Sequence, residues 1–328
     1  MKFLGIHWAR SHILSSSREL MHWQHLCHED EGCNYIVARE NDELLGVLGY
    51  IPTSHYDPQL KDRDTLWLTT WLVKQDCKVP ALGLSLHRYL SETIPHQGIG
   101  TVGNNAEVVP LYKALGHDCG ELKQYFMLND ELAAFSLARV GIIPEALPPS
   151  SESTVDVAEL CDPEELTRMI FHIGRRASAL PTKSPGYFAR RYLHHPFYTY
   201  RVFRLQQQSR NLGLIALRRV SHKGACALRL VDYWGDSAGL AASRSFLQDF
   251  LKNEKAEFID VYNHGIRSGV FAAAGFHELQ TEGLIIPNYF EPFERKNVRI
   301  RYTFKTPQGQ GYIFFKADGD QDRPNLIS

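Results

Sequence analysis

The predicted strands and helices follow the same order in the two halves of this 328-residue chain. In the first half, residue patterns predict strands over 34–39, 44–50 and 65–73, a helix over 82–90, a strand over 98–103 and a helix over 107–115. In the second half they predict strands over 200–205, 212–219 and 227–234, a helix over 238–253, a strand over 258–262 and a helix over 266–274. Gly116 and Gly275 follow the last helix of each half, where glycine commonly ends a helix. This repeat predicts an α/β fold with two mixed sheets in tandem.

A segment poor in helix and strand formers separates the two halves. Residues 144–154 contain three prolines and four hydroxyl residues, a composition typical of a surface linker. We therefore expect one domain over 1–145 and a second domain over 155–328.

Charge and composition exclude several classes of protein. The formal net charge of -1 leaves no basic excess for a phosphate backbone, so we expect no nucleic-acid partner. No apolar run reaches the ~18 residues that a membrane span needs, and the N-terminus has no secretory signal. The six cysteines are scattered without a CxxC motif, which is typical of reduced thiols. We expect a cytoplasmic protein that acts on a small molecule.

A short segment with one basic residue lies between the strand over 65–73 and the helix that follows it. It runs Lys78-Val79-Pro80-Ala81-Leu82-Gly83-Leu84-Ser85 and resembles the Arg/Gln-x-x-Gly-x-Gly/Ala loop of the GNAT family, the acyl-CoA-dependent N-acyltransferases. Lys78 stands at the basic position and Gly83 at the second glycine, whereas Ala81 replaces the first glycine. The resemblance implies that main-chain N–H groups of this loop hold the pyrophosphate of CoA.

The segment 103–117 carries a second resemblance to GNAT enzymes. Two asparagines precede the run Leu111-Tyr112-Lys113-Ala114-Leu115-Gly116, which is similar to the family's LY-x-x-LG-F motif, with His117 in place of Phe. The resemblance implies that Tyr112 protonates the departing thiolate and that a main-chain N–H of the central strand stabilises the acyl oxygen. An alternative role for Tyr112 is to pack the short helix on its sheet. The implied cofactor-binding residues are Leu72, Val73, Lys78, Ala81, Leu82, Gly83, Leu84, Ser85, Asn104 and Asn105.

The second half lacks these features. Its loop before the helix over 238–253 has no basic residue and contains Asp236, and an acid is a poor neighbour for a pyrophosphate. The segment after Asn263 has no tyrosine at the place that corresponds to Tyr112. We therefore expect acyl-CoA, with acetyl-CoA as the donor, to bind the first half and the acceptor to bind the second half.

Four segments show a looser similarity to GNAT-like proteins of bacterial O-antigen and capsule gene clusters. They are 183–192, 195–196, 287–293 and 318–325. This resemblance implies that the acceptor is the amine of a nucleotide-linked amino sugar in surface polysaccharide biosynthesis. A solvated helix surface is the alternative for the basic residues. The candidate acceptor-binding residues are Lys183, Arg191, His195, Tyr233 and Asn263.

No motif identifies the base that accepts the proton of the amine. His55 and Asp57 lie in a loop after the strand over 44–50, and His264 lies at a strand end, where open α/β sheets often bind ligands. An ordinary turn and a structural histidine are the alternatives for these residues. The chain has no G-x-S-x-G or Cys/His signature, so we expect direct transfer without a covalent enzyme intermediate.

Three other sequence patterns resemble known binding motifs, for a dinucleotide, for calcium and for zinc. Gly98–Gly103 matches G-x-G-x-x-G, but a dinucleotide site needs a strand before the first glycine and a helix at the last. Asp318–Asp322 resembles the start of a calcium loop, but Arg323 stands where that loop needs glycine, so an exposed polar tail and a substrate-binding tail are the alternatives. A third group lacks the spacing of a zinc site and comprises His22, His25, Cys27, His28 and Cys33. We expect no metal.

Two other functions are compatible with the same resemblance. The first is an aminoacyl transferase similar to the Fem peptidoglycan enzymes, which also pair two GNAT-like domains. Such an enzyme needs a surface for tRNA, which the charge balance disfavours. The second is a GNAT-like binding protein without catalysis, which the alanine at position 81 and the incomplete second half leave open.

Overall fold

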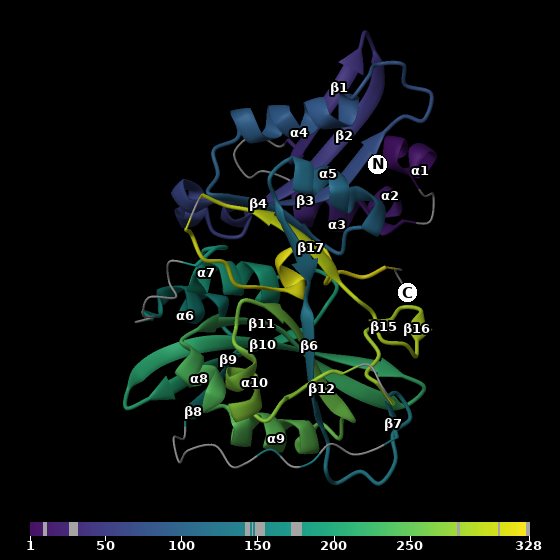
Figure 1. Ribbon diagram of the computed structural model, residues 1–328. Coiled ribbons are helices and arrows are strands. Elements are labelled where there is room, and N and C mark those ends of the chain that lie inside the picture. Colours follow the sequence, from purple (N-terminus) through teal and green to yellow (C-terminus); the bar gives the residue numbers. More distant parts are fainter. Residues whose placement is uncertain are drawn as a thin grey trace.

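The computed structural model confirms the mixed α/β class with two mixed sheets (Figure 1). One sheet lies in the upper half of Figure 1 and the other in the lower half, and the C-terminal segment, in yellow, runs between them. The structure describes residues 1–8, 12–25, 32–141, 145, 147, 155–171, 179–280, 283–307 and 309–325.

The first sheet has six strands. Their order is β1 (Tyr35–Glu40), β2 (Glu43–Pro52), β3 (Thr65–Val73), β4 (Gly98–Val102), β17 (Arg301–Lys305) and β5 (Asp118–Glu121). All neighbouring strands are antiparallel except β3 and β4. The predicted strands of the first half are therefore confirmed, and β3 begins and ends at the predicted residues.

The second sheet has eight strands, and again only one pair, β11 and β12, is parallel. Its main path is β13 (His277–Glu278), β6 (Lys123–Leu128), β12 (Phe258–His264), β11 (Ala225–Gly235), β10 (Arg210–His222), β9 (Tyr200–Gln207) and β8 (Asp156–Leu160). The eighth strand, β18 (Phe314–Phe315), pairs with β12. Two small pairs stand apart: β7 (Arg139–Val140) with β14 (Leu284–Ile285), and β15 (Tyr289–Phe290) with β16 (Phe293–Glu294).

Each sheet contains a strand from the other half of the chain. β6 comes from the first half and pairs with β12, whereas β17 comes from the second half and lies between β4 and β5 (Figure 1). The two halves of the sequence therefore share both sheets. Residues 148–154 of the predicted linker lie outside the described residues, and the limits of the two domains stay a prediction.

Helices connect the strands in a similar way in the two sheets. The connection from β3 to β4 contains α4 (Leu82–Thr93), and α5 (Val109–Ala114) follows β4. The connection from β11 to β12 contains α8 (Ser237–Ala241) and α9 (Arg244–Asn253), and α10 (Ser268–Ala273) follows β12. The other α-helices in the described residues are α1 (Lys2–His7), α2 (Ile13–Ser16) and α3 (Arg18–His25) beside the first sheet, and α6 (Pro163–Arg168) and α7 (Pro185–Phe188) beside the second.

The prediction of one continuous helix over 238–253 is wrong. The N–H and the hydroxyl of Ser243 both donate to the main-chain oxygen of Leu240, at 3.1 and 2.7 Å. A serine side chain that bonds to the main chain in this way competes with the regular helical pattern. The helix is therefore divided between Ala241 and Arg244.

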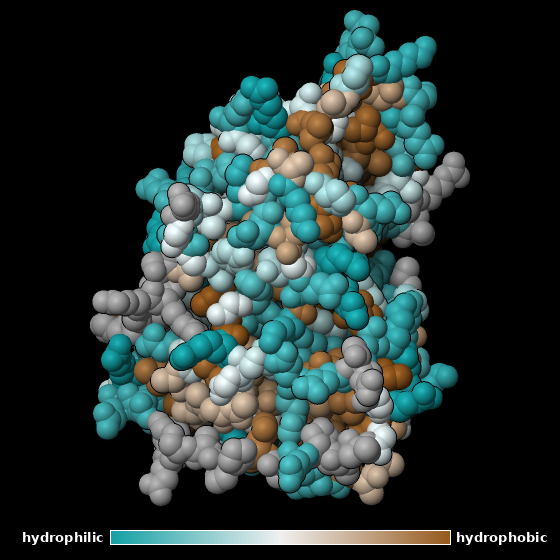
Figure 2. All heavy atoms as spheres, in the orientation of Figure 1, coloured by the Kyte–Doolittle hydropathy of each residue, from teal (hydrophilic) through white to brown (hydrophobic). Residues whose placement is uncertain are grey.

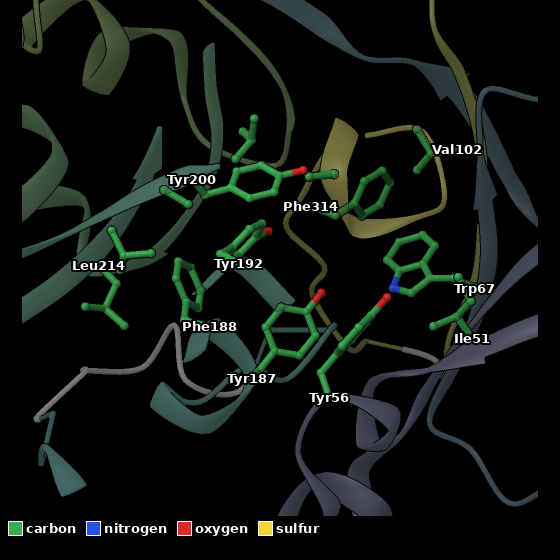
Figure 3. Packing of buried hydrophobic residues seen from close by; sticks show 14 of the residues in the cluster. Ile51, Tyr56, Trp67, Val102, Tyr187, Phe188, Tyr192, Tyr200, Leu214 and Phe314 are labelled. Carbon is green, nitrogen blue, oxygen red and sulfur yellow. The ribbon is translucent and has the colours of Figure 1, made fainter. Parts of the chain in front are cut away.

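One hydrophobic core joins the two sheets (Figure 3). Trp67 of β3 is fully buried and its ring lies 5.4 Å from that of Phe314 in β18. Tyr56 lies 5.3 Å from Tyr187 of α7 in the same way. Each buried aromatic side chain stabilises the folded chain by about 1.5–3 kcal/mol. The C-terminal segment is thus part of the core between the sheets.

The parallel pair of each sheet is short. β3 and β4 are paired only where Thr65–Trp67 face Gly98–Gly100, and β11 and β12 are paired only at two positions. Beyond Trp67, β3 continues to Val73 without a partner on the side of β4 among the described strands. Each sheet therefore has an opening between the two central strands.

Candidate functional site

The opening of the first sheet leads to a cavity of about 270 Å³, which we call the β3–β4 cavity. Residues 69–72 of β3 form one wall, and residues 101–105, at the end of β4 and in the next loop, form another. The lining is completed by Trp8, Val108, Tyr112, Asp320, Gln321 and Arg323. The cavity is therefore built by the first sheet, an N-terminal residue and the C-terminal segment.

Tyr112 is held in this cavity by neighbouring rings. It is 3% exposed, and its ring lies 5.0 Å from that of His117 and 5.7 Å from that of Trp71, both in edge contacts. Burial, with a smaller contribution from Cys119, raises the pKa of the Tyr112 hydroxyl above its usual value. The hydroxyl is thus protonated at neutral pH and is available as a proton donor.

Two buried histidines lie behind Tyr112. Burial is the main cause that lowers the pKa of His87 to about 4 and that of His117 to about 3. Both nitrogens of His117 and Nε2 of His87 lack hydrogen-bond partners among the described residues. Both side chains are therefore neutral at physiological pH and form an uncharged wall beside the tyrosine.

The segment predicted to bind pyrophosphate lies at the surface. Lys78, Ala81, Leu84 and Ser85 are exposed. Ala81 is the residue before α4 and has a left-handed backbone with φ 54° and ψ 26°, and it provides no side-chain cap. The first N–H groups of a helix have no partner within the helix, so this end of α4 presents main-chain donors to solvent.

A hydrogen bond connects this segment to the cavity. Trp71 Nε1 donates to the main-chain oxygen of Gly83 at 3.1 Å, and the same indole lines the β3–β4 cavity. A Cβ at Gly83 would lie 3.2 Å from Trp71 Nε1, which is tighter than an ordinary contact. A side chain at this position would therefore displace the Trp71 indole slightly, and glycine lets β3 and α4 approach closely without that shift.

The predicted cofactor-binding residues divide between the two ends of this arrangement. Leu72, Asn104 and Asn105 line the β3–β4 cavity, as Tyr112 does. Val73 packs beside Gly83 at the end of β3. The other six lie at or near the start of α4: Lys78, Ala81, Leu82, Gly83, Leu84 and Ser85.

The predicted bases do not line the β3–β4 cavity. His55 is buried and its Nε2 lies 2.6 Å from the main-chain oxygen of Trp23. Asp57 accepts hydrogen bonds from Gln59 N and from the Ser184 hydroxyl. His264 stacks on Tyr312 at 5.0 Å, and burial lowers its pKa. A catalytic role for any of these residues stays a prediction.

The predicted acceptor-binding residues are all buried. Three of them contact the C-terminal segment: Lys183 Nζ lies 2.7 Å from Asp318, Arg191 donates to Ala317 O at 3.2 Å, and Asn263 donates to Phe314 O at 3.0 Å. In the other two, His195 Nδ1 accepts from Tyr198 N at 2.9 Å, and the Tyr233 hydroxyl donates to Asp236 O. Their role toward a substrate stays a prediction. In this structure three of them contact the C-terminal segment over residues 314–325, which we call the tail.

The tail fills the opening of the second sheet. β18 pairs with β12 at Asn263 and His264, beyond the last position where β12 pairs with β11. Asp318 accepts from Lys183 and from Phe315 N. A pantetheine arm would meet these side chains in the second sheet, whereas the opening of the first sheet leads to a cavity.

The acidic tail has basic and aromatic partners. Asp322 bonds Arg218 at 2.7 Å and the Tyr200 hydroxyl at 2.6 Å, and Asp320 lies 3.5 Å from Arg323. An exposed polar tail is therefore the wrong alternative for Asp318–Asp322, since all three aspartates are buried. The sequence pointed to this segment, but nothing in it indicated that Asp320 and Arg323 would lie in the cavity of Tyr112.

The structure also shows where the glycine motif and the His/Cys group lie. Gly98–Val102 is the strand β4 itself, so Gly98 and Gly100 lie within the strand and Gly103 follows its end. Cys27 and His28 lie outside the described residues, and His22 bonds Arg18 on an exposed face. Within the described ranges, no group of three or more His, Cys, Asp or Glu side chains is placed to hold a metal ion.

Of the helices the structure describes, none has the length and apolar character to cross a membrane.

Comparisons with known proteins give similarity at the level of solved structures. No model of a protein family matches the sequence, and no curated protein matches it. A GCN5-related N-acetyltransferase from Anabaena variabilis is 11% identical, with a TM-score of 0.49, over 85% of this chain and 66% of that chain. A putative acetyltransferase from Pyrococcus horikoshii is 11% identical, with a TM-score of 0.43, over 92% and 80%. A GCN5-related N-acetyltransferase from Kribbella flavida is 11% identical, with a TM-score of 0.44, over 83% and 59%. All three TM-scores are below 0.5.

Proposed function

We propose that this protein is an N-acyltransferase that moves an acyl group from acyl-CoA to an amine. The observation that supports the proposal most is the opening between β3 and β4, with an exposed helix N-terminus at α4 and the buried Tyr112 in the cavity. Trp71 connects the two, since its indole bonds Gly83 and lines the cavity. A diphosphate and a thioester joined by a flexible arm match these two ends.

The donor would lie along β3. Its pyrophosphate would accept hydrogen bonds from the first N–H groups of α4, near the exposed Lys78. Its arm would run beside residues 69–72, where the main chain of β3 has no partner on the side of β4 among the strands that the structure describes. Figure 2 shows hydrophobic residues gathered over β2 and β3 in the upper part of the view, a surface compatible with an aliphatic arm.

The transfer needs one proton acceptor and one proton donor. The neutral amine attacks the thioester carbon, a C–N bond forms and the C–S bond breaks. We assign the acceptor role to Asp320, the only carboxylate in the described lining of the β3–β4 cavity, acting directly or through a water molecule. Tyr112 would donate its proton to the CoA sulfur and is kept protonated by burial. In this proposal the base, Asp320, comes from the C-terminal tail, and the acid, Tyr112, comes from the first half of the chain.

The acceptor of the acyl group is the second part of the proposal. The resemblance of four segments to proteins of surface polysaccharide biosynthesis favours the amine of a nucleotide-linked amino sugar. A panel of amines that includes such sugars, simple amino sugars and amino acids would test this point, with release of free CoA thiol as the readout. The nucleotide-linked sugars should give the highest kcat/KM.

A thermal titration tests the donor. A ligand that binds only the folded chain stabilises it by about 2.7 kcal/mol at a hundred times its Kd, so acetyl-CoA should raise the melting temperature with saturation. Lys78→Met should reduce this rise, whereas Arg168→Met, on the exposed face of α6, should not. A melting temperature unchanged by acetyl-CoA and by longer acyl-CoAs would contradict the proposal. Binding without turnover on any amine would instead favour a non-catalytic binding protein.

A further inference from the structure

A second cavity meets the β3–β4 cavity at the C-terminal tail. It has a volume of about 110 Å³, and Asp320, Gln321 and Arg323 line both cavities. Its other side is formed by Arg218 of β10, Arg229 of β11 and Lys316 of the tail, so we call it the arginine cavity. The tail segment 320–323 is therefore the common wall of the two cavities.

Three cationic side chains from separate elements converge on the arginine cavity. Arg218 bonds the carboxylate of Asp322 at 2.7 Å. Arg229 lies 3.7 Å from Asp260. Lys316 Nζ instead donates to the amide oxygen of Asn288 at 3.0 Å, and no carboxylate within the described ranges lies at ion-pair distance from it. Lys316 is thus the cation of this group without an anionic partner.

The remaining carboxylates of the lining have other partners. Asp320 lies 3.5 Å from Arg323, and Glu291 accepts a hydrogen bond from the Tyr198 hydroxyl at 3.2 Å. On the basic side, Arg218 Nε, Arg229 Nε and Asn288 Nδ2 lack hydrogen-bond partners among the described residues. This side of the cavity therefore has more donors than acceptors, which is the condition that an anionic ligand relieves.

The protonation of Lys316 reports the same imbalance. Burial, and then the charge of Arg229, lowers the pKa of Lys316 to about 7, with Arg218 acting in the same direction. Asp322 and Asp260 act in the opposite direction but do not restore the usual value. An anion in the cavity would favour the charged form of the lysine and raise its pKa.

The position of the arginine cavity connects it to solvent and to the proposed reaction. It shares Tyr198, Arg218 and Phe290 with a third cavity of about 440 Å³, whose lining includes the exposed Thr199 and Arg219. On its other side the arginine cavity reaches the tail segment 320–323, which also lines the β3–β4 cavity. A molecule that enters from the third cavity would first meet side chains that line both cavities, Arg218 and Glu291 among them.

We infer that the arginine cavity binds an anionic group of the acceptor, a phosphate or a carboxylate, while the amine of the same molecule extends toward the β3–β4 cavity. This inference rests on the proposed acyl transfer for the word acceptor. The anion site itself rests on Arg218, Arg229 and Lys316. The acceptor is therefore an amine that also carries a negative charge.

The decisive measurement is the titration of Lys316 by NMR in protein labelled with ¹³C at the lysine ε-carbon. The signal is assigned by its loss in Lys316→Met. Replacing chloride by inorganic phosphate, or in a separate series by acetate, at constant ionic strength should raise the titration midpoint of Lys316 by about one pH unit or more. The anion that gives the rise distinguishes phosphate from carboxylate recognition. An unchanged midpoint with both anions overturns the inference.

Calorimetry supplies a second readout that does not depend on a single signal. The affinity for the effective anion should fall at least about tenfold in Lys316→Met, because a charge-assisted hydrogen bond is lost. It should be retained in Lys316→Arg and in the control Lys296→Met, whose lysine pairs with Glu294 outside this lining. Equal anion affinity in Lys316→Met and wild type overturns the inference. Acetyl-CoA binding is measured on the same samples, so that a failure of the anion site is distinguished from a failure of the proposed function.

Discussion

The indole of Trp71 donates a hydrogen bond of 3.1 Å to the main-chain oxygen of Gly83, and this bond joins the last residues of β3 to the first turn of α4. In the proposed donor site, the start of α4 is the exposed end that would hold the pyrophosphate. The part of β3 beside Tyr112 is the buried end where the reaction would take place. The ring centroid of Trp71 also lies 5.7 Å from that of Tyr112. One side chain therefore contacts both parts of the proposed site.

Trp71→Phe should weaken acetyl-CoA binding. The variant keeps an aromatic ring beside Tyr112 but loses the bond to Gly83, at a cost of about 1 kcal/mol in the free energy of unfolding. The start of α4 should then be less well positioned, and the Kd for acetyl-CoA should rise roughly fivefold for each 1 kcal/mol of lost binding free energy. Titration calorimetry measures the Kd. Trp8→Phe is the control, since Trp8 lines the same cavity without a bond to α4, and equal losses in the two variants would argue against this role.

Ala81→Gly should stabilise the protein. Ala81 has a left-handed backbone with φ 54°, which costs an L-residue roughly 1–2 kcal/mol and costs glycine almost nothing. Part of this gain is lost to the greater freedom of glycine in the unfolded chain, so the expected net gain is about 0.5–1 kcal/mol. Urea unfolding measures it. Ala114→Gly, in the exposed end of α5, should destabilise by about 1 kcal/mol, and the same sign for both substitutions would contradict the explanation.

His117→Phe should remove a pH dependence of stability. The folded-state pKa of His117 is about 3, below the unfolded value of 6.5, so the unfolded chain binds the proton first as the pH falls. The free energy of unfolding should therefore decrease from pH 6.5 toward pH 3. From this residue alone the loss at pH 5 should be about 2 kcal/mol.

The phenylalanine variant should lose less stability on acidification. It should also be as stable as wild type or more stable at pH 7.5, because the two nitrogens of the buried imidazole lack partners among the described residues. Urea unfolding at pH 7.5 and at pH 5 gives both values. His22→Phe, at an exposed position of α3, is the control. An unchanged difference between the two pH values in His117→Phe would show that other groups cause the dependence.

Tyr112→Phe should reduce kcat by about a hundredfold and leave the KM for acetyl-CoA nearly unchanged. Loss of a positioned general acid typically costs 10²–10⁴ in rate, and the ring contacts with Trp71 and His117 are kept. A stopped assay of CoA thiol release gives both constants. A variant with full activity would assign Tyr112 to packing, the alternative that the sequence left open.

Local patterns in the sequence predicted the central elements of the fold. The β-branched and aromatic run Thr65–Val73 forms β3 as expected, and the residues before α4 lie at its N-terminus as the loop resemblance implies. Tyr112, which the second motif indicated, lines the β3–β4 cavity, and its catalytic role stays a prediction. These features depend on residues close in sequence, where period and turn chemistry are informative.

The exchange of strands could not be predicted in this way. Tyr302 and Phe304 give β17 an apolar pattern, but nothing in that pattern shows that it pairs with β4, about two hundred residues earlier. The position of the proposed base depends on the same exchange, because Asp320 reaches the cavity only after β17 and β18 have placed the tail between the sheets. His55, Asp57 and His264 lie in a loop or at a strand end, where the sequence predicts candidate bases, and the structure gives each of them other partners.

Asp320→Asn should lower kcat by about 10²–10³ and retain acetyl-CoA binding. The amide keeps the shape of the side chain beside Arg323 but cannot accept a proton from the amine. The residual rate should increase with pH up to the pKa of the acceptor amine, because the free amine must then form in solution. Thermal titration with acetyl-CoA controls for the fold. Gln321→Ala changes a neighbouring cavity residue without a titratable group, and its kcat should stay within about threefold of wild type. An equal loss in both variants would mean that the tail positions the substrate and that the proton leaves by another route.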